Sequence, residues 1–178
     1  MPLQPAKMKD FPLLYTARLK LRKIQVEDIP SLVNHANNKN ISDHILNMPY
    51  PYQEPDAVFR ISYVHQGFKT NTRYVFAIAL NSNDEFIGEI SLHIDQEKNI
   101  AELGYWIGEL FWNKGFATEA IAAVLKFGFE KLNLDIIFAT CHADNIGSSK
   151  VLEKNKLIRN GAAGNIIQYS MKRQIEVH

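Results

Sequence analysis

The alternation of hydrophobic and polar positions predicts a series of β-strands and helices along the chain. Between Ala17 and Ile24, leucines at every second position share one side and basic residues share the other, which is typical of a half-buried strand. From Phe116 to Leu132, apolar residues recur at intervals of three and four, which predicts an amphipathic helix. Further strands are expected at 74–80, 86–94, 100–107, 136–140 and 166–171, and further helices at 26–37, 56–68 and 145–155.

The predicted elements follow the order β-α-α-β-β-β-α-β-α-β, which indicates a mixed α/β fold. Polar turns separate the three successive strands between residues 74 and 107, so this part is expected to form an antiparallel meander. The segment 48–55 holds three prolines and is expected to be a loop. Residues 1–14 are expected to form an irregular lead-in and residues 15–178 one domain, because a chain of this length usually builds a single core.

The composition excludes several classes of protein. With 46% hydrophobic and 22% charged residues, the chain is expected to fold rather than to be disordered. Cys141 is the only cysteine, which excludes an internal disulfide, and the histidine spacings match no metal motif, so no metal is expected. The net charge of +1 and the lack of a long apolar run predict no nucleic-acid partner, no membrane partner and a cytoplasmic location.

One glycine lies where a predicted strand leads into the long helix, in the stretch Trp112-Asn-Lys-Gly-Phe-Ala-Thr-Glu-Ala120. The first amides of a helix have no partner within the helix, and the helix dipole adds positive charge there. Gly115 has no side chain to keep an anion away from these amides, and Lys114 adds a formal charge. The stretch therefore suits a phosphate group, although a plain strand-to-helix turn has the same appearance.

This stretch resembles the acetyl-coenzyme A signature of the GNAT N-acetyltransferase superfamily, Q/R-x-x-G-x-G/A, with Gly115 as the glycine and Ala117 at the last position. Trp112 departs from the Gln/Arg position, but an aromatic residue there is common in the branch of ribosomal-protein N-terminal acetyltransferases (the RimJ/RimL type). Further stretches resemble that branch in the same order along residues 15–172: Ala17–Arg22, Pro49–Tyr52, Ala101-Glu-Leu-Gly-Tyr-Trp106, and Asn145-Ile-Gly-Ser148 with the helix that follows.

The resemblance implies a fold, a cofactor and a set of cofactor contacts. The fold would be a single domain with a central, mostly antiparallel twisted sheet, splayed at the cofactor site and flanked by about four helices. Acetyl-CoA would be the co-substrate, with its pantetheine arm along the end of the strand that finishes at Ile107. Asn145 would bond the pantetheine, Ser148 would donate a proton to the coenzyme sulfur or hydrogen-bond it, and Lys150 would accompany Lys114 at the phosphates. The pyrophosphate would meet the backbone of Trp112, Asn113, Lys114, Gly115, Phe116, Ala117 and Thr118.

Strand parity selects the candidate bases for amine acetylation. If the turn between the second and third meander strands closes near residues 97–98, three facing pairs result: Glu89 with Trp106, Ser91 with Gly104, and His93 with Glu102. Glu102 is our first candidate for the base because it also lies in the stretch that resembles the family, with Glu89 and a bound water as the alternatives. A structural cross-strand pair is the competing interpretation of these residues.

The acceptor is expected to be a primary amine, either a protein N-terminus or a small molecule such as a polyamine, an amino acid or an antibiotic. An α-amine, with a pKa of about 7.7–8.0, needs less help to lose its proton than a lysine-like amine of about 10.4. Tyr50, Tyr52, His93 and Trp106 are the candidate acceptor contacts. A non-catalytic acyl-CoA sensor and an interaction module remain alternatives, and the chain could be a monomer or a homodimer.

Overall fold

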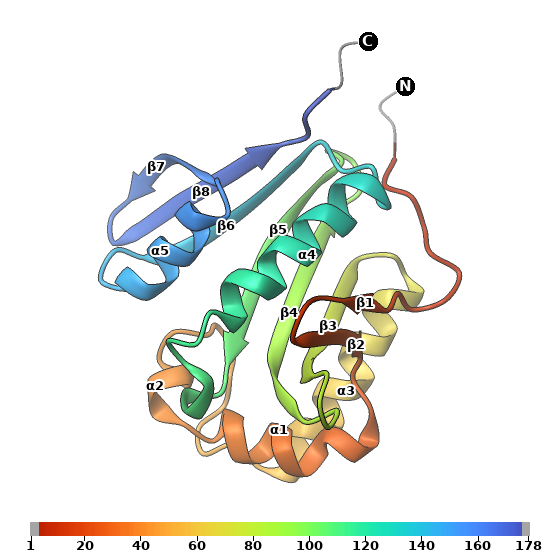
Figure 1. Cartoon of the computed structure of the whole chain (residues 1–178), viewed down its shortest axis with the longest axis vertical. Helices are drawn as coiled ribbons and strands as arrows, with labels where there is room; N and C mark the ends of the chain where they lie inside the picture. The colour runs from red at the N-terminus through yellow and green to blue at the C-terminus, as the bar shows by residue number, and fades with distance from the viewer. Residues whose placement is uncertain (1–3, 176–178) are drawn as a thin grey trace.

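The computed structural model describes residues 4–175 and contains an eight-stranded sheet with helices on both faces (Figure 1). The strands are β1 Leu14–Tyr15, β2 Leu19–Lys23, β3 Arg73–Leu80, β4 Phe86–Asp95, β5 Ile100–Ile107, β6 Ile136–His142, β7 Ile158–Ala163 and β8 Ile166–Lys172. The helices are α1 Ile29–Ala36, α2 Lys39–Ser42, α3 Glu54–Lys69, α4 Phe116–Glu130 and α5 Ile146–Lys154, with 3₁₀ turns η1 Val26–Asp28 and η2 Glu109–Phe111.

The predicted fold class is confirmed, and every predicted strand and helix is present with shifted ends. Three short elements were not predicted: β1, α2 and β7. The first two have two and four residues, which is too few to show a period. All six residues of β7 are exposed, so its sequence carries no buried face, and only its pairing with β8 makes it a strand. The first three residues of the predicted lead-in lie outside the described residues.

The proline-rich loop ends earlier than the sequence predicts. Helix α3 begins at Glu54, so that Pro55 lies in its first turn. This position tolerates proline because the first amides of a helix need no acceptor within the helix.

Two hydrophobic clusters hold the sheet between its helices. On one face, β-strand residues such as Phe76 and Ile90 are fully buried with Ile121 and Val124 of α4. On the other face, α1 and α3 cover a second cluster that includes Trp106. The sheet is therefore a central layer, and both sides of β5 face a packed environment.

The sheet order is β1-β2-β3-β4-β5-β6-β8-β7, and every neighbouring pair is antiparallel except β5 and β6. Strand β4 pairs with all eight residues of β5, which confirms the predicted register of Glu89 with Trp106, Ser91 with Gly104 and His93 with Glu102. Strand β6 pairs with β5 only from Ile100 to Glu102, and β6 then stays paired with β8. In Figure 1 the two strands diverge from the end near the chain termini, and α2 and α5 lie on either side of the wide end.

Candidate active site

The free edge of β5 is the first feature of the site. In an antiparallel pair the backbone groups of successive residues point alternately to and away from the partner strand. Gly108 N–H donates to Ile87 O at 2.8 Å, so the backbone groups of Trp106 point to β4 and those of Tyr105 and Ile107 point to the gap beside β6. The Ile107 carbonyl accepts the indole N–H of Trp112 at 2.6 Å. Tyr105 and the Ile107 N–H are thus available to an extended ligand.

The start of α4 lies next to this edge in the chain. Gly115 precedes the helix with φ of 82° and offers no side-chain cap. The first bond within the helix runs from Glu119 N–H to Gly115 O at 3.1 Å, so the amides of Phe116, Ala117 and Thr118 have no helical acceptor. These amides and the helix dipole favour an anion. Asn113 also has a positive φ, of 59°, which the sequence did not reveal.

Arg18, which directly precedes β2, contacts both the loop before α4 and the first turn of that helix. Its backbone N–H and Nε donate to the Glu119 carboxylate at 2.7 and 2.9 Å, and its Nη1 donates to Lys114 O at 2.9 Å. The guanidinium also lies 4.3 Å from the ring centre of Phe116. Burial alone would raise the pKa of Glu119, but hydrogen bonds from Thr16 and Arg18 lower it below its ordinary value. The sequence placed Arg18 only on the polar side of a strand, so its part in the site was missed.

The two candidate phosphate lysines lie on exposed surface. Lys114 is in the loop before α4, with its Nζ 5.7 Å from the ring centre of Phe111. Lys150 is on α5. Neither makes an ion pair with a carboxylate among residues 4–175. Their contact with phosphate stays a prediction.

A hydroxyl pair connects β5 to α5. Tyr105 Oη lies 2.7 Å from Ser148 Oγ. Asn145 caps α5 with its side chain, which accepts the Ser148 N–H at 3.1 Å. Burial raises the pKa of Tyr105, while its bond to Ser148 opposes that rise. The structure thus brings together Ser148 and Asn145, which the sequence singled out, and adds Tyr105, whose motif was recognised without a role for its side chain.

Glu89 lies on the face of the sheet that α1 and α3 cover, opposite to the face of Tyr105, and it forms an ion pair with Arg60 of α3. Its side chain is 5% exposed, and its carboxylate accepts Arg60 Nη2 at 2.8 Å. Burial alone would lower the pKa of Arg60, but the charge and hydrogen bonds of Glu89 raise it above its ordinary value. Tyr52 is buried in the same region, and its pKa is raised by burial and then by the charge of Glu89. Arg60 is a further residue that the sequence did not indicate.

Glu102 lies on the same face as Glu89 and is exposed. It lies four positions before Trp106, the partner of Glu89, so the two residues are roughly 13 Å apart along the strands. They lie at opposite ends of this face instead of in one compact patch. Glu102 is also the last residue of β5 that pairs with β6, so it lies where the gap begins. It makes no ion pair within the described part of the chain.

Comparison with known proteins decides the family. A sequence profile described as acetyltransferase (GNAT) domain matches residues 18–158. This chain belongs to the GNAT acetyltransferase family. The uncharacterized N-acetyltransferase p20 of Bacillus licheniformis is 33% identical over 151 residues, which cover 83% of each chain. The acetyltransferase is therefore an enzyme of the N-acetyltransferase class.

Ribosomal-protein acetyltransferases are among the relatives, as the motifs predicted. The ribosomal-protein-serine acetyltransferase of Escherichia coli is 29% identical over 89 residues, which cover 49% of this chain and 50% of that protein. A solved structure of RimL, a ribosomal L7/L12 α-N-protein acetyltransferase in complex with coenzyme A, shares the fold at a TM-score of 0.81 and 18% identity, and covers 90% of this chain and 98% of that chain.

The predicted acceptor contacts of this acetyltransferase differ in exposure. Tyr52 and Trp106 are 5% and 7% exposed, and the Trp106 ring lies 5.9 Å from that of Phe86. Tyr50 is 56% exposed, and His93 is also exposed. Tyr52 and Trp106 thus belong to the core beneath the candidate acceptor site, while Tyr50 and His93 are open to a ligand.

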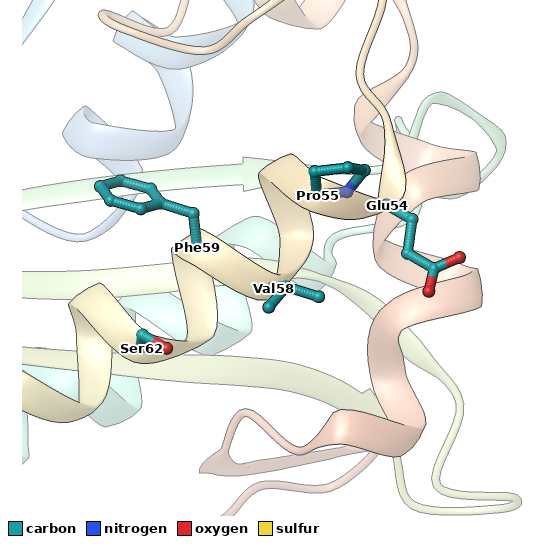
Figure 2. Close-up of a pocket in the computed structure, with 5 residues that line it drawn as sticks. All are labelled: Glu54, Pro55, Val58, Phe59 and Ser62. Carbon is teal, nitrogen blue, oxygen red and sulfur yellow. The ribbon is translucent and has the colours of Figure 1, made fainter.

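A surface hollow of about 710 Å³ lies elsewhere, on α3. Its lining comes entirely from that helix, and Figure 2 shows the side chains along it: Glu54, Pro55, Val58, Phe59 and Ser62. No predicted site residue lines it, and it lacks the converging polar groups of a reaction centre.

Within residues 4–175, no helix is both long and apolar enough to cross a membrane. No group of three or more His, Cys, Asp or Glu side chains there is arranged to hold a metal ion.

Proposed function

We propose that this acetyltransferase transfers the acetyl group of acetyl-CoA directly to a primary amine. The observation that carries the proposal is the free edge of β5, which leads through a short loop to the uncapped start of α4. An extended pantetheine amide chain can pair with Tyr105 and Ile107 as an added strand does. The diphosphate oxygens can then accept hydrogen bonds from the backbone amides of Phe116, Ala117 and Thr118.

The remaining cofactor contacts follow from the same placement. The backbone between Trp112 and Gly115 borders the diphosphate site, and Trp112 fixes the end of β5 through its bond to the Ile107 carbonyl. We propose that the ammonium groups of Lys114 and Lys150 contact the phosphates, since neither lysine forms an ion pair with a carboxylate within the described residues.

Acetyl-CoA supplies an activated acetyl group as a thioester, and the protein supplies proton transfer and positioning. The amine nitrogen forms a bond to the carbonyl carbon, and Glu102, directly or through water, accepts the proton that nitrogen loses. We assign this task to Glu102 because it is exposed beside the gap, whereas the oxygens of Glu89 are bonded to Arg60. A backbone N–H group of β5 that faces the gap close to Glu102 stabilises the negative charge on the carbonyl oxygen.

The carbon–sulfur bond then breaks, and Ser148 Oγ–H donates its proton to the leaving thiolate. Tyr105 Oη, 2.7 Å from that oxygen, passes a proton to Ser148 and takes one up from water, and Glu102 releases its proton to water, so that the enzyme returns to its starting state. A protein N-terminus is the first acceptor we propose, because a ribosomal-protein-serine acetyltransferase is among the relatives. A small amine is the second, since nothing in the fold excludes it. We further propose a cytoplasmic enzyme, either monomeric or homodimeric.

The cofactor site is tested by thermal unfolding with and without acetyl-CoA. A ligand at 100 times its dissociation constant adds about 2.7 kcal/mol to the free energy of unfolding, which raises Tm by several degrees. Gly115→Glu puts a carboxylate at the anion site and should abolish this rise. Gly164→Glu is the matched control, because Gly164 also has a positive φ and nothing lies within 4 Å of its added Cβ.

The rise should persist in Gly164→Glu. A wild type without any rise at millimolar acetyl-CoA contradicts the proposed function. If acetyl-CoA does bind, release of free coenzyme A thiol in the presence of amines measures the reaction itself. A protein that binds acetyl-CoA but never releases thiol with any primary amine is a sensor instead of an enzyme that uses this mechanism.

A further inference from the structure

The flank of α3 that faces β4 and β5 forms a wall beside the sheet face that carries Glu89, His93 and Glu102. Arg60 on this flank bonds Glu89 of β4. His65 lies on the other flank, with its Nε2 3.0 Å from Ile24 O beyond β2. The two contacts fix the direction of the helix surface, so that Arg60 and Tyr63 border the sheet face of β4 and β5.

The floor beside this wall is made of small residues. Ser91 and Gly104 face each other between the pair Glu89–Trp106 and the pair His93–Glu102. A Cβ at Gly104 would lie 3.2 Å from Ser91 Oγ, so the glycine leaves room that any side chain would take. The sheet face between α3 and the gap at β5 is therefore covered by small residues at this point.

Two guanidinium groups border this part of the sheet. Arg73 Cζ lies 3.8 Å from the ring centre of Tyr63, and Arg60 Cζ lies 5.8 Å from the same centre. Arg73 Nη2 donates to Tyr63 O at 3.2 Å. Within residues 4–175, Glu89 is the carboxylate that pairs with Arg60, and Arg73 has no carboxylate partner. The wall thus holds one positive charge more than its carboxylate neutralises.

His93 lies among the same charged groups. His93 faces Arg73 on one side and Glu102 on the other in the sheet register. Its pKa is lowered by partial desolvation and then by the positive charges of Arg60 and Arg73, against the opposing charge of Glu89. His93 is therefore mainly neutral at pH 7 and adds no charge to the wall.

Glu102 provides a negative charge at the other side of this part of the sheet. It lies two strands away from Arg73 in the same cross-strand row, a separation of roughly 10 Å between the strand backbones. A positive wall and a negative group at this separation complement a molecule that carries both charges close together.

We propose that the acceptor carries a carboxylate near its primary amine, and that Arg73 with Arg60 binds this carboxylate while the amine lies beside Glu102. The inference rests on the proposed function, because it places the amine next to the assigned base. Two sources share this chemistry: a free α-amino acid, and a peptide whose first residue has an acidic side chain.

Two matched pairs of acceptors test the proposal with the intact enzyme, with coenzyme A thiol release as the readout. The first pair is L-leucine and L-leucinamide, which differ only in the carboxylate. The second is a C-terminally amidated tetrapeptide that begins with Asp and the same peptide that begins with Asn. The carboxylate member of one pair should have at least a tenfold higher kcat/KM, and the pair that shows this identifies the source.

Arg73→Gln removes the charge without leaving a paired carboxylate behind. It should raise the KM of the preferred carboxylate acceptor about tenfold and leave the rates with the amide members unchanged. Arg73→Lys should recover part of the preference. Arg159→Gln, on the exposed strand β7, is the matched control and should behave as the wild type does.

The possible failures are distinguishable. No rise in Tm with acetyl-CoA overturns the proposed function and this inference together. A normal rise in Tm overturns this inference alone when the members of each pair react equally, when the neutral members react faster, or when neither carboxylate member reacts. An equal loss of activity towards both members of the preferred pair in Arg73→Gln assigns a structural role to Arg73 and also overturns it.

Discussion

The edge of β5 that faces β4 is paired at all eight positions, whereas the edge that faces β6 is paired only from Ile100 to Glu102. The paired edge is packed without spare room, since a Cβ at Gly88 would lie 2.2 Å from Trp106 O. The open edge leaves backbone groups without a strand partner, which is costly unless water or a ligand satisfies them. One edge of β5 therefore stabilises the sheet, and the other is free for the proposed cofactor.

The largest effect is expected at the residue where the open edge begins. Glu102→Gln removes the proposed base and should lower kcat about a thousandfold at pH 7, a typical size for the loss of acid–base catalysis. The KM for acetyl-CoA should stay within twofold. Glu97→Gln, in the turn between β4 and β5, serves as the control. A Glu102→Gln variant with wild-type kcat would remove Glu102 from the mechanism.

The hydroxyl pair across the gap should have the next largest effect. Ser148→Ala removes the proposed proton donor and should lower kcat about a hundredfold, with acetyl-CoA binding retained in thermal unfolding. Ser149→Ala is a close control, because Ser149 contacts Cys141 Sγ at 3.5 Å instead of Tyr105. Equal losses in the two variants would indicate a general disturbance of α5.

The closed edge should respond in stability, not in catalysis. Gly88→Ala forces a methyl group against the backbone of Trp106 and should lower the free energy of unfolding by about 2–3 kcal/mol. Gly161→Ala is the control, since its added Cβ meets nothing within 4 Å. Urea unfolding measures both variants. An unchanged urea midpoint for Gly88→Ala would show that the backbones of β4 and β5 can move apart enough to accept the methyl group.

A smaller effect is expected at Arg18, which contacts the loop before α4. Arg18→Gln removes the ion pair with Glu119 and the bond to Lys114 O, and should raise the KM for acetyl-CoA about tenfold with kcat nearly unchanged. Lys20→Gln alters a neighbouring basic residue of β2 that pairs with Asp84 instead. If both variants keep the wild-type KM, the loop holds its shape without Arg18.

The smallest effect concerns pH. His35 is 8% exposed against Gly108 and Phe111, just after β5, and burial lowers its pKa below 6.5. The unfolded chain therefore takes up the proton first as pH falls. His35 contributes its full stability above about pH 6.5, and this contribution is lost as pH falls from there to the lower folded-state value. Unfolding between pH 5 and 7.5, compared with His35→Gln, should reveal the difference, and parallel profiles would contradict it.

The sequence predicted the features that depend on local pattern. The register of β4 and β5 follows from two alternating strands joined by a short turn. The start of α4 follows from one glycine before a periodic helix. The ribosomal-acetyltransferase motifs then indicated the family, which the profile confirms.

The features that sequence missed are contacts between distant segments. Arg60 and Glu89 are separated by 29 positions, Tyr105 and Ser148 by 43, and Arg18 and Glu119 by 101. No period or motif links such pairs, and only the packing of helices on the sheet brings them together. The divergence of β6 from β5 was expected only from the family resemblance, because no local pattern shows that β8 returns from the end of the chain to hold β6.

The central claim is that the open edge of β5 and the start of α4 hold coenzyme A, and amide hydrogen exchange tests it residue by residue. In the free protein the amides of Tyr105 and Ile107 should exchange faster than those of Gly104 and Trp106, which are bonded to β4. Saturating coenzyme A should slow exchange at Tyr105 and Ile107 at least tenfold and leave Gly104 and Trp106 almost unchanged. Coenzyme A that binds without protecting Tyr105 and Ile107 would contradict the account.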